Sequence, residues 1–141
     1  MRILVPVDGS DPSLAAVRFV VDTLVPASDG LEIHLLNVQP PLPSAASTFI
    51  DSGVVRGFHQ EEGEKALAPA RKLLDGAGVA YSSHTAVGDP AETVVTYADQ
   101  RQCDGIVMGT RGLGRVAGLV LGSVASKVLH LTKVPVTFVK H

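Results

Sequence analysis

Short apolar runs alternate along this chain with segments whose apolar residues recur every three or four positions. Five runs have the length and the aliphatic content of a buried strand, at residues 2–7, 31–38, 79–87, 104–109 and 135–140. Helical spacing follows each of the first four runs, starting near Ser10, spanning about 59–74, starting after Gly88 and spanning 124–131. Strands separated by helices predict right-handed crossovers. We therefore expect an α/β fold: one open five-stranded, mainly parallel sheet with helices on both faces.

Proline, glycine and capping residues mark the expected ends of these elements. Ser10 or Asp11 before Pro12 begins the first helix, and residues 26–30 end it. Asp89-Pro90 begins the third helix. Residues 39–56 contain three prolines and a stretch rich in serine and alanine, which predicts a variable loop rather than a regular element.

Length and composition indicate one globular domain covering residues 1–141. The chain is 45% hydrophobic and 18% charged, which excludes a disordered protein. No apolar run reaches the roughly 18 residues of a membrane span, and Pro6 and Asp8 interrupt any signal peptide. The single cysteine, Cys103, suits a reducing compartment. We therefore expect a cytoplasmic location, no membrane partner, and Cys103 as a small packing residue.

Charge is distributed unevenly between the two parts of the chain. Residues 105–141 carry five basic residues and no Asp or Glu, whereas residues 1–104 carry 7 basic and 14 acidic residues. A locally positive region in an acidic chain favours a small polyanion as the ligand. Nucleic acid fits less well, because the chain has no Trp and only six Phe and Tyr residues for stacking.

The strongest chemical signal is a glycine-rich stretch from Gly109 to Ser123, which lies between an expected strand and an expected helix. Glycine allows the backbone to approach a ligand closely. Ser123 is a favourable N-cap, and the helix after it offers unpaired amides and the positive end of a dipole. Arg111 and Arg115 add positive charge. The stretch predicts a phosphate-binding loop.

Two common phosphate motifs do not describe this loop. The P-loop pattern needs a Gly-Lys pair, and the chain has none. The segment 112–117 matches G-x-G-x-x-[GA], but it follows the fourth expected strand and no acidic residue follows it, whereas a dinucleotide fold places the motif after its first strand. NAD and FAD are therefore set aside.

The remaining pattern, Gly109-x2-Gly112-x9-Gly122-Ser123, resembles the ATP-binding signature of the universal stress protein family. The resemblance covers nearly the whole chain and includes Leu4-Val-Pro-Val-Asp8-Gly-Ser10, Gly88-Asp-Pro90 and Val134-Pro-Val136. It implies a five-stranded parallel sheet and, in most members, a dimer. It implies nothing about the loop 39–56, which lies where the family varies.

The resemblance also implies a set of residues that bind ATP with Mg²⁺ held mainly through the phosphates. Asp8 would bond the ribose or help the Mg²⁺, Val38 would hold the adenine edge beside Pro6 and Val7, and the helix amides would bind phosphate. The complete set is Pro6, Val7, Asp8, Val38, Gly109, Arg111, Gly112, Gly114, Arg115, Gly122, Ser123 and Val124. The C-terminal strand, around Val136–Val139, is the expected homodimer contact.

Other residue patterns support simpler interpretations. The five histidines show no metal-ligand spacing, so no direct metal site is expected. No catalytic residue is expected either, because no histidine or glutamate adjoins the glycine motif as an obvious base.

The leading hypothesis is an ATP-binding regulatory module of the stress response that is at most a slow ATPase and has an unknown protein client. The alternative is a nucleotide-independent dimeric interaction module. A third hypothesis, an adenylate-forming or hydrolytic enzyme, lacks a Ser-Gly-Gly loop after the first strand.

Overall fold

The computed structural model describes residues 1–43, 49–111 and 121–141. Its centre is a five-stranded sheet in which all pairs of neighbouring strands are parallel, in the order β3-β2-β1-β4-β5. The strands are β1 (Arg2–Pro6), β2 (Glu32–Gln39), β3 (Ser82–Val87), β4 (Gly105–Gly109) and β5 (Val136–Val139). The predicted α/β fold with a five-stranded parallel sheet is confirmed.

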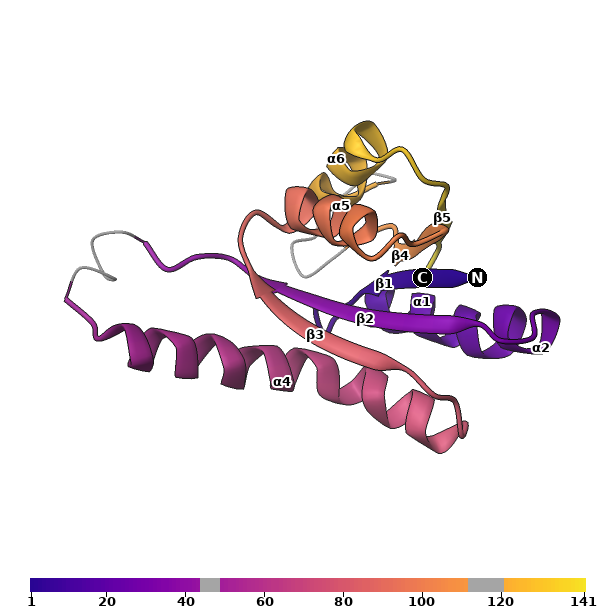
Figure 1. The fold of residues 1–141 in the computed structure, drawn as a ribbon, viewed down its shortest axis with the longest axis horizontal. Coiled ribbons are helices and arrows are strands. Elements are labelled where there is room, and N and C mark those ends of the chain that lie inside the picture. The colour runs from indigo at the N-terminus through magenta and orange to yellow at the C-terminus, as the bar shows by residue number, and fades with distance from the viewer. Residues whose placement is uncertain (44–48, 112–120) are drawn as a thin grey trace.

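Helices cover both faces of the sheet (Figure 1). One layer contains α1 (Asp11–Phe19) and α4 (Ser52–Gly76), and the opposite layer contains α5 (Pro90–Gln100) and α6 (Ser123–Leu131). Successive residues of β1 point to opposite faces. Val5 therefore joins the core that includes Leu67 of α4, whereas Leu4 joins the core that includes Val94 of α5.

The first helical segment ends at Ala27, inside the expected range of residues 26–30. After α1 the chain passes through a π-helical stretch (Val20–Leu24) and α2 (Val25–Ala27) before Ser28 adopts an extended conformation. Pro26 therefore lies inside the helical segment, where we expected a break. It occupies the first turn of α2, a position at which the missing N–H of proline costs little.

Helix α4 begins at Ser52, so the expected helix start near 59 and the expected loop limit at 56 are wrong. The side chain of Asp51 accepts a hydrogen bond from the Gly53 backbone N–H at 2.7 Å and caps this helix. The buried residues of α4 begin only at His59. The first two turns carry Val54 and Phe58 at helical spacing, but both side chains are exposed, and Gly53 and Gly57 lower the local helix propensity.

The order of the strands in the sheet indicates where a ligand site is expected. From β1 the chain proceeds outward through β2 to β3, then crosses to the other side of β1 and forms β4 and β5. In open parallel sheets, ligands bind beyond the carboxyl ends of the strands at such a reversal. Here those ends belong to β1 and β4. Among the described residues, no helix is both long and apolar enough to cross a membrane.

Candidate functional site

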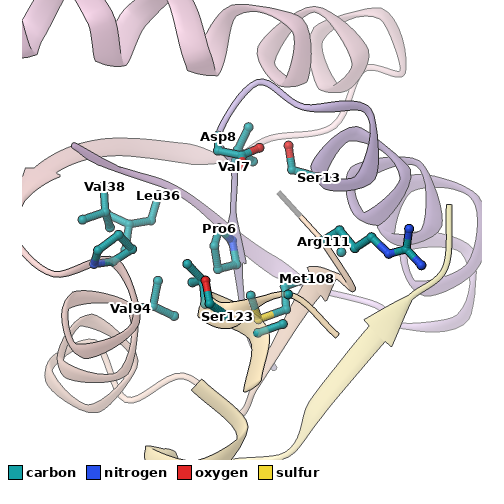
Figure 2. Close-up of a pocket in the computed structure, with 15 residues that line it drawn as sticks. Pro6, Val7, Asp8, Ser13, Leu36, Val38, Val94, Met108, Arg111 and Ser123 are labelled. Atoms are coloured by element: carbon teal, nitrogen blue, oxygen red, sulfur yellow. The ribbon is translucent and has the colours of Figure 1, made fainter. Parts of the chain in front are cut away.

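A pocket of about 210 Å³ lies at the carboxyl ends of β1 and β4 and beside the first turns of α5 and α6 (Figure 2). Nine of the twelve residues that the sequence suggested line it: Pro6, Val7, Asp8, Val38, Gly109, Arg111, Gly122, Ser123 and Val124. The other three, Gly112, Gly114 and Arg115, lie outside the described residues. Segments more than a hundred positions apart in the sequence thus meet in one cavity.

Six further residues line the pocket and were missed from the sequence: Ser13, Leu36, Pro90, Val94, Met108 and Ala125. For two of these six residues, the sequence contained a feature that could have identified them. Leu36 precedes Val38 by two positions in a strand and so shares its face. Pro90 belongs to the Gly88-Asp-Pro90 helix start, which is one of the segments that carry the family resemblance.

The pocket has an apolar side and a charged side. Figure 2 shows Leu36, Val38 and Val94 together at one side, whereas Arg111 lies at the other side with its guanidinium extending away from these three residues. Pro6, Met108 and Ser123 lie between them. A flat apolar group suits the first side, and an anion suits the second.

Asp8 is held in the turn that connects β1 to α1. Its Oδ1 accepts hydrogen bonds from the Ser10 hydroxyl and, at 2.9 Å, from the Ser10 backbone N–H. Ser10 in turn caps α1 by accepting from the Ser13 N–H at 3.3 Å. Gly9 between them has a φ of +84°, a conformation that glycine adopts without strain. The turn and the first turn of α1 therefore place the Asp8 carboxylate and Ser13 along one edge of the pocket.

The first turn of α6 forms the opposite edge. Gly122 is the N-cap of this helix, and Ser123 is its first helical residue, so the expectation that Ser123 caps the helix is wrong. The Gly122 N–H donates to the Thr110 carbonyl at 2.6 Å, and its own carbonyl accepts from the Ser126 N–H at 3.0 Å. These bonds fix Gly122 in the extended conformation of a cap. The first amides of α6, which have no partners within the helix, lie at the pocket.

Gly109 has a role that the sequence did not reveal. A Cβ atom at this position would lie 2.5 Å from the Pro12 carbonyl oxygen and 2.7 Å from its carbonyl carbon. The end of β4 thus packs directly on the backbone of the first turn of α1. Glycine is required here by the contact between two elements of the fold, whatever the pocket binds.

An ion pair joins the two helices that start at the pocket. Asp89 caps α5 by accepting from the Glu92 N–H at 3.0 Å, and the same oxygen accepts from Lys127 Nζ of α6 at 3.0 Å. The backbone hydrogen bond and Lys127 lower the pKa of the Asp89 carboxyl below its ordinary value. Both groups are partly exposed, so the pair orients the helices and contributes little stability.

In the part of the chain that the structure describes, no three His, Cys, Asp or Glu side chains cluster as metal ligands. Cys103 is buried in the core beside α5, and burial raises the pKa of its thiol. A buried thiol in apolar surroundings is inert.

Comparison with known proteins identifies a family and relatives that match almost the whole chain. The model of the universal stress protein family matches residues 1–140. A universal stress protein of Methanocaldococcus jannaschii is 32% identical over 142 residues, which cover 99% of this chain and 81% of that protein.

Solved structures are similar over the same length. The hypothetical protein MJ0577 superposes with a TM-score of 0.83 at 27% identity and covers 99% of this chain and 95% of its own. A universal stress protein in complex with cAMP superposes with a TM-score of 0.72 at 27% identity, over 99% of this chain and 96% of its own.

Proposed function

The chain belongs to the universal stress protein family, and we propose that it binds an adenine nucleotide in the pocket at the carboxyl ends of β1 and β4. The observation that carries this proposal is the convergence in that one pocket of an apolar wall, the amides of a helix N-terminus and the turn carboxylate of Asp8. The cAMP complex of a relative supports the ligand class. The nucleotide would act as the regulatory signal of a stress-response module.

The two sides of the pocket assign the parts of the nucleotide. The base would contact Leu36, Val38 and Val94, because apolar side chains that line a pocket bury the faces of a planar ring. The amides at the start of α6, between the two sides, would bind phosphate, and Arg111 would add positive charge at the far side. A volume of about 210 Å³ is below the roughly 300–1,000 Å³ of typical ligand pockets. The pocket would therefore enclose the base and ribose and leave the outer phosphates at its mouth.

We propose ATP with Mg²⁺ as the ligand of the resting protein. Asp8 is the carboxylate among the described lining residues, and Mg²⁺ is usually held by one or two carboxylates together with substrate phosphates. The residues present therefore fit a metal ion that enters with the nucleotide. Asp8 is also positioned to accept from ribose hydroxyls.

Any hydrolysis by this site would be slow. The described lining residues include neither histidine nor glutamate, and general-base catalysis needs a group of suitable pKa within hydrogen-bond reach of the attacking water. We expect turnover below about one per minute. Release of phosphate from ATP by nucleotide-free protein, followed over hours, measures this rate.

We propose that the protein forms a homodimer through β5. We also propose a cytoplasmic location and a protein client. β5 is an edge strand of the sheet, and an edge strand offers unpaired backbone groups to a second strand. Its four residues, Val136–Val139, are apolar apart from Thr137. The Pro135 and Val139 carbonyls accept hydrogen bonds from the β4 side, so the Val136 N–H points to the open edge. Sedimentation equilibrium of the wild type and of a Val136→Pro variant tests this contact, since proline removes that donor from the edge.

Thermal unfolding of nucleotide-stripped protein with Mg²⁺ and each of ATP, ADP, AMP, cAMP and NAD tests the proposed function. A ligand at 100 times its Kd stabilises the folded state by about 2.7 kcal/mol, which raises the Tm of a domain of this size by several degrees. A larger shift with ATP than with AMP or NAD supports the proposal. No shift with any nucleotide at millimolar concentration would favour the nucleotide-independent interaction module.

A further inference from the structure

A second cluster of chemically active side chains lies at the amino ends of β2 and β3, at the other end of these strands from the pocket. His34 of β2 is in register with Ser82, the first residue of β3. Glu32 lies two positions before His34 in β2 and so shares its face of the sheet. The three side chains form a continuous hydrogen-bonded chain under the C-terminal half of α5.

The geometry fixes the roles within this chain. Glu32 Oε2 accepts from Arg2 Nε at 2.9 Å, and hydrogen bonds from Arg2 and His34 lower the pKa of the Glu32 carboxyl. Glu32 is thus an ionised acceptor, so the proton of a neutral His34 ring resides on Nε2, which lies 2.8 Å from Glu32 Oε1. The lone pair of Nδ1 then faces the Ser82 hydroxyl at 3.1 Å.

His34, the base, is more deeply buried than Ser82, the nucleophile. His34 is only 7% exposed, whereas Ser82 is exposed on the edge strand. The Tyr97 hydroxyl also faces His34 Nδ1, at 3.3 Å. The shielded imidazole is thus oriented by a carboxylate and adjoins the hydroxyl of an exposed residue, which is the arrangement that activates a serine for nucleophilic attack.

We propose that Ser82, His34 and Glu32 form a second site in which Ser82 accepts an acyl group from small activated esters. The Ser82 oxygen bonds to the ester carbonyl carbon while its proton passes to His34 Nδ1. The carbon–oxygen bond to the leaving group then breaks, and the leaving group departs as the alkoxide or phenolate or takes the proton from His34. When the leaving group departs as an anion, His34 loses the proton to solvent before the second step. Water then attacks the acyl carbon and gives a proton to His34 Nδ1, the bond from that carbon to the Ser82 oxygen breaks, and His34 returns the proton to Ser82 as the carboxylic acid leaves. Ser82 and His34 are the catalytic residues, and Glu32 is a positioning residue that sets the tautomer.

Labelling with diisopropyl fluorophosphate tests the proposal directly. Attack by the Ser82 oxygen displaces fluoride and leaves a diisopropyl phosphoryl group on the residue, which mass spectrometry of the intact protein and of its peptides locates. We expect the adduct on Ser82 and its loss in Ser82→Ala. Ser83→Ala is a matched control, because Ser83 points to the opposite face, where its hydroxyl accepts from Arg71 at 2.8 Å. Equal labelling of Ser82→Ala and wild type would overturn the proposal, as would no labelling of the wild type.

The base has its own test. Hydrolysis of p-nitrophenyl acetate at Ser82 should fall on the order of 10²-fold in His34→Gly, and added imidazole should restore it, which a purely structural role for His34 does not predict. Tyr97→Phe should keep the activity, whereas its loss would place the reacting hydroxyl on Tyr97 and refute the assignment. In Glu32→Gln the ¹⁵N resonances of His34 should show a larger share of the Nδ1–H tautomer. Unchanged ¹⁵N resonances would refute the role of Glu32.

Discussion

The side-chain amide of Asn37 in β2 donates to the backbone carbonyl of Val7 at 2.8 Å, at the point where the chain leaves β1 and enters the pocket. Asn37 is 2% exposed, and its own side-chain oxygen accepts from the Gln39 amide at 2.7 Å. The Val7 N–H donates to the Leu36 carbonyl at 2.8 Å. Two bonds from β2 therefore hold Val7 and fix the direction in which the next residue, Asp8, leaves the sheet.

Asn37→Leu, which keeps the volume but removes the donor, should destabilise the protein by about 1–3 kcal/mol, because it leaves a buried carbonyl without its partner. Urea denaturation of the variant and the wild type measures this difference. The same variant should bind nucleotide more weakly, since Asp8 loses its support. Gln39→Leu is the comparison variant: it removes the donor to the Asn37 oxygen but leaves the Val7 carbonyl bonded, so it should keep the nucleotide affinity of the wild type. An unchanged urea midpoint for Asn37→Leu would contradict the role assigned to this bond.

Gly109→Ala should destabilise the fold by about 1–3 kcal/mol, because the added methyl group meets the Pro12 backbone, which cannot turn aside as a flexible side chain can. The measurement is the free energy of unfolding without nucleotide. Gly57→Ala in α4 is the control. No atom lies within 4 Å of a Cβ built at Gly57, so this variant should be neutral or more stable by about 0.5–1 kcal/mol. Equal stability of the two variants would mean that β4 and α1 separate easily.

The contrast between these two glycines shows what the sequence could reveal. Strand–helix alternation was sufficient for the sheet and for most of the helices, because buried aliphatic runs and capping residues are local signals. The contact of Gly109 with Pro12 joins residues 97 positions apart, and nothing local encodes it. The described ends of the glycine motif, Gly109, Gly122 and Ser123, line the pocket, although Gly109 is also explained by packing.

Ser123 illustrates a second limit. Serine is a better N-cap than glycine in general, but the hydrogen bond from the Gly122 N–H to Thr110 anchors the preceding residue at the cap position. A tertiary contact thus shifted the helix start by one residue. For α4 the start was missed although Val54 and Phe58 are spaced as in a helix. Gly53 and Gly57 lower the local helix propensity, and the buried residues begin only at His59. Local preference located the elements, whereas long-range contacts set their ends.

The ion pair between Asp89 and Lys127 predicts a pH-dependent stability. The pKa of Asp89 is lowered in the folded state from an ordinary value of 3.8, so its contribution is present above that value and is lost as the pH falls through the folded pKa. The pKa of Lys127 is raised above 10.5, so its contribution is complete below 10.5 and is lost as the pH rises through the folded pKa. The pair stabilises between these limits.

Asp89→Asn keeps a capping side chain and removes the charge. Its Tm should be slightly below that of the wild type at pH 7, and the difference should vanish as the solution is acidified below the folded pKa of Asp89. Thermal unfolding of both proteins from pH 2.5 to pH 8, in low and in high salt, measures this convergence. A Tm difference that stays constant across the acid range would mean that the cap alone, and not the charge, accounts for the effect.

Gly122→Val separates binding from folding at the proposed phosphate site. Gly122 has φ −70° and ψ 171°, an extended conformation that any residue adopts, and valine keeps the N–H that donates to Thr110. The cost to the fold should therefore stay below about 1 kcal/mol, the scale of a weaker cap. The branched side chain would stand where phosphate approaches the first amides of α6, so nucleotide affinity should fall at least about a hundredfold, or roughly 2.7 kcal/mol.

Calorimetric titration with ATP and Mg²⁺, with the ligand-free Tm as the folding control, measures both effects. Wild-type affinity in this variant would exclude the start of α6 as the phosphate site, whereas a large fall in the ligand-free Tm would show that Gly122 is needed for the fold itself.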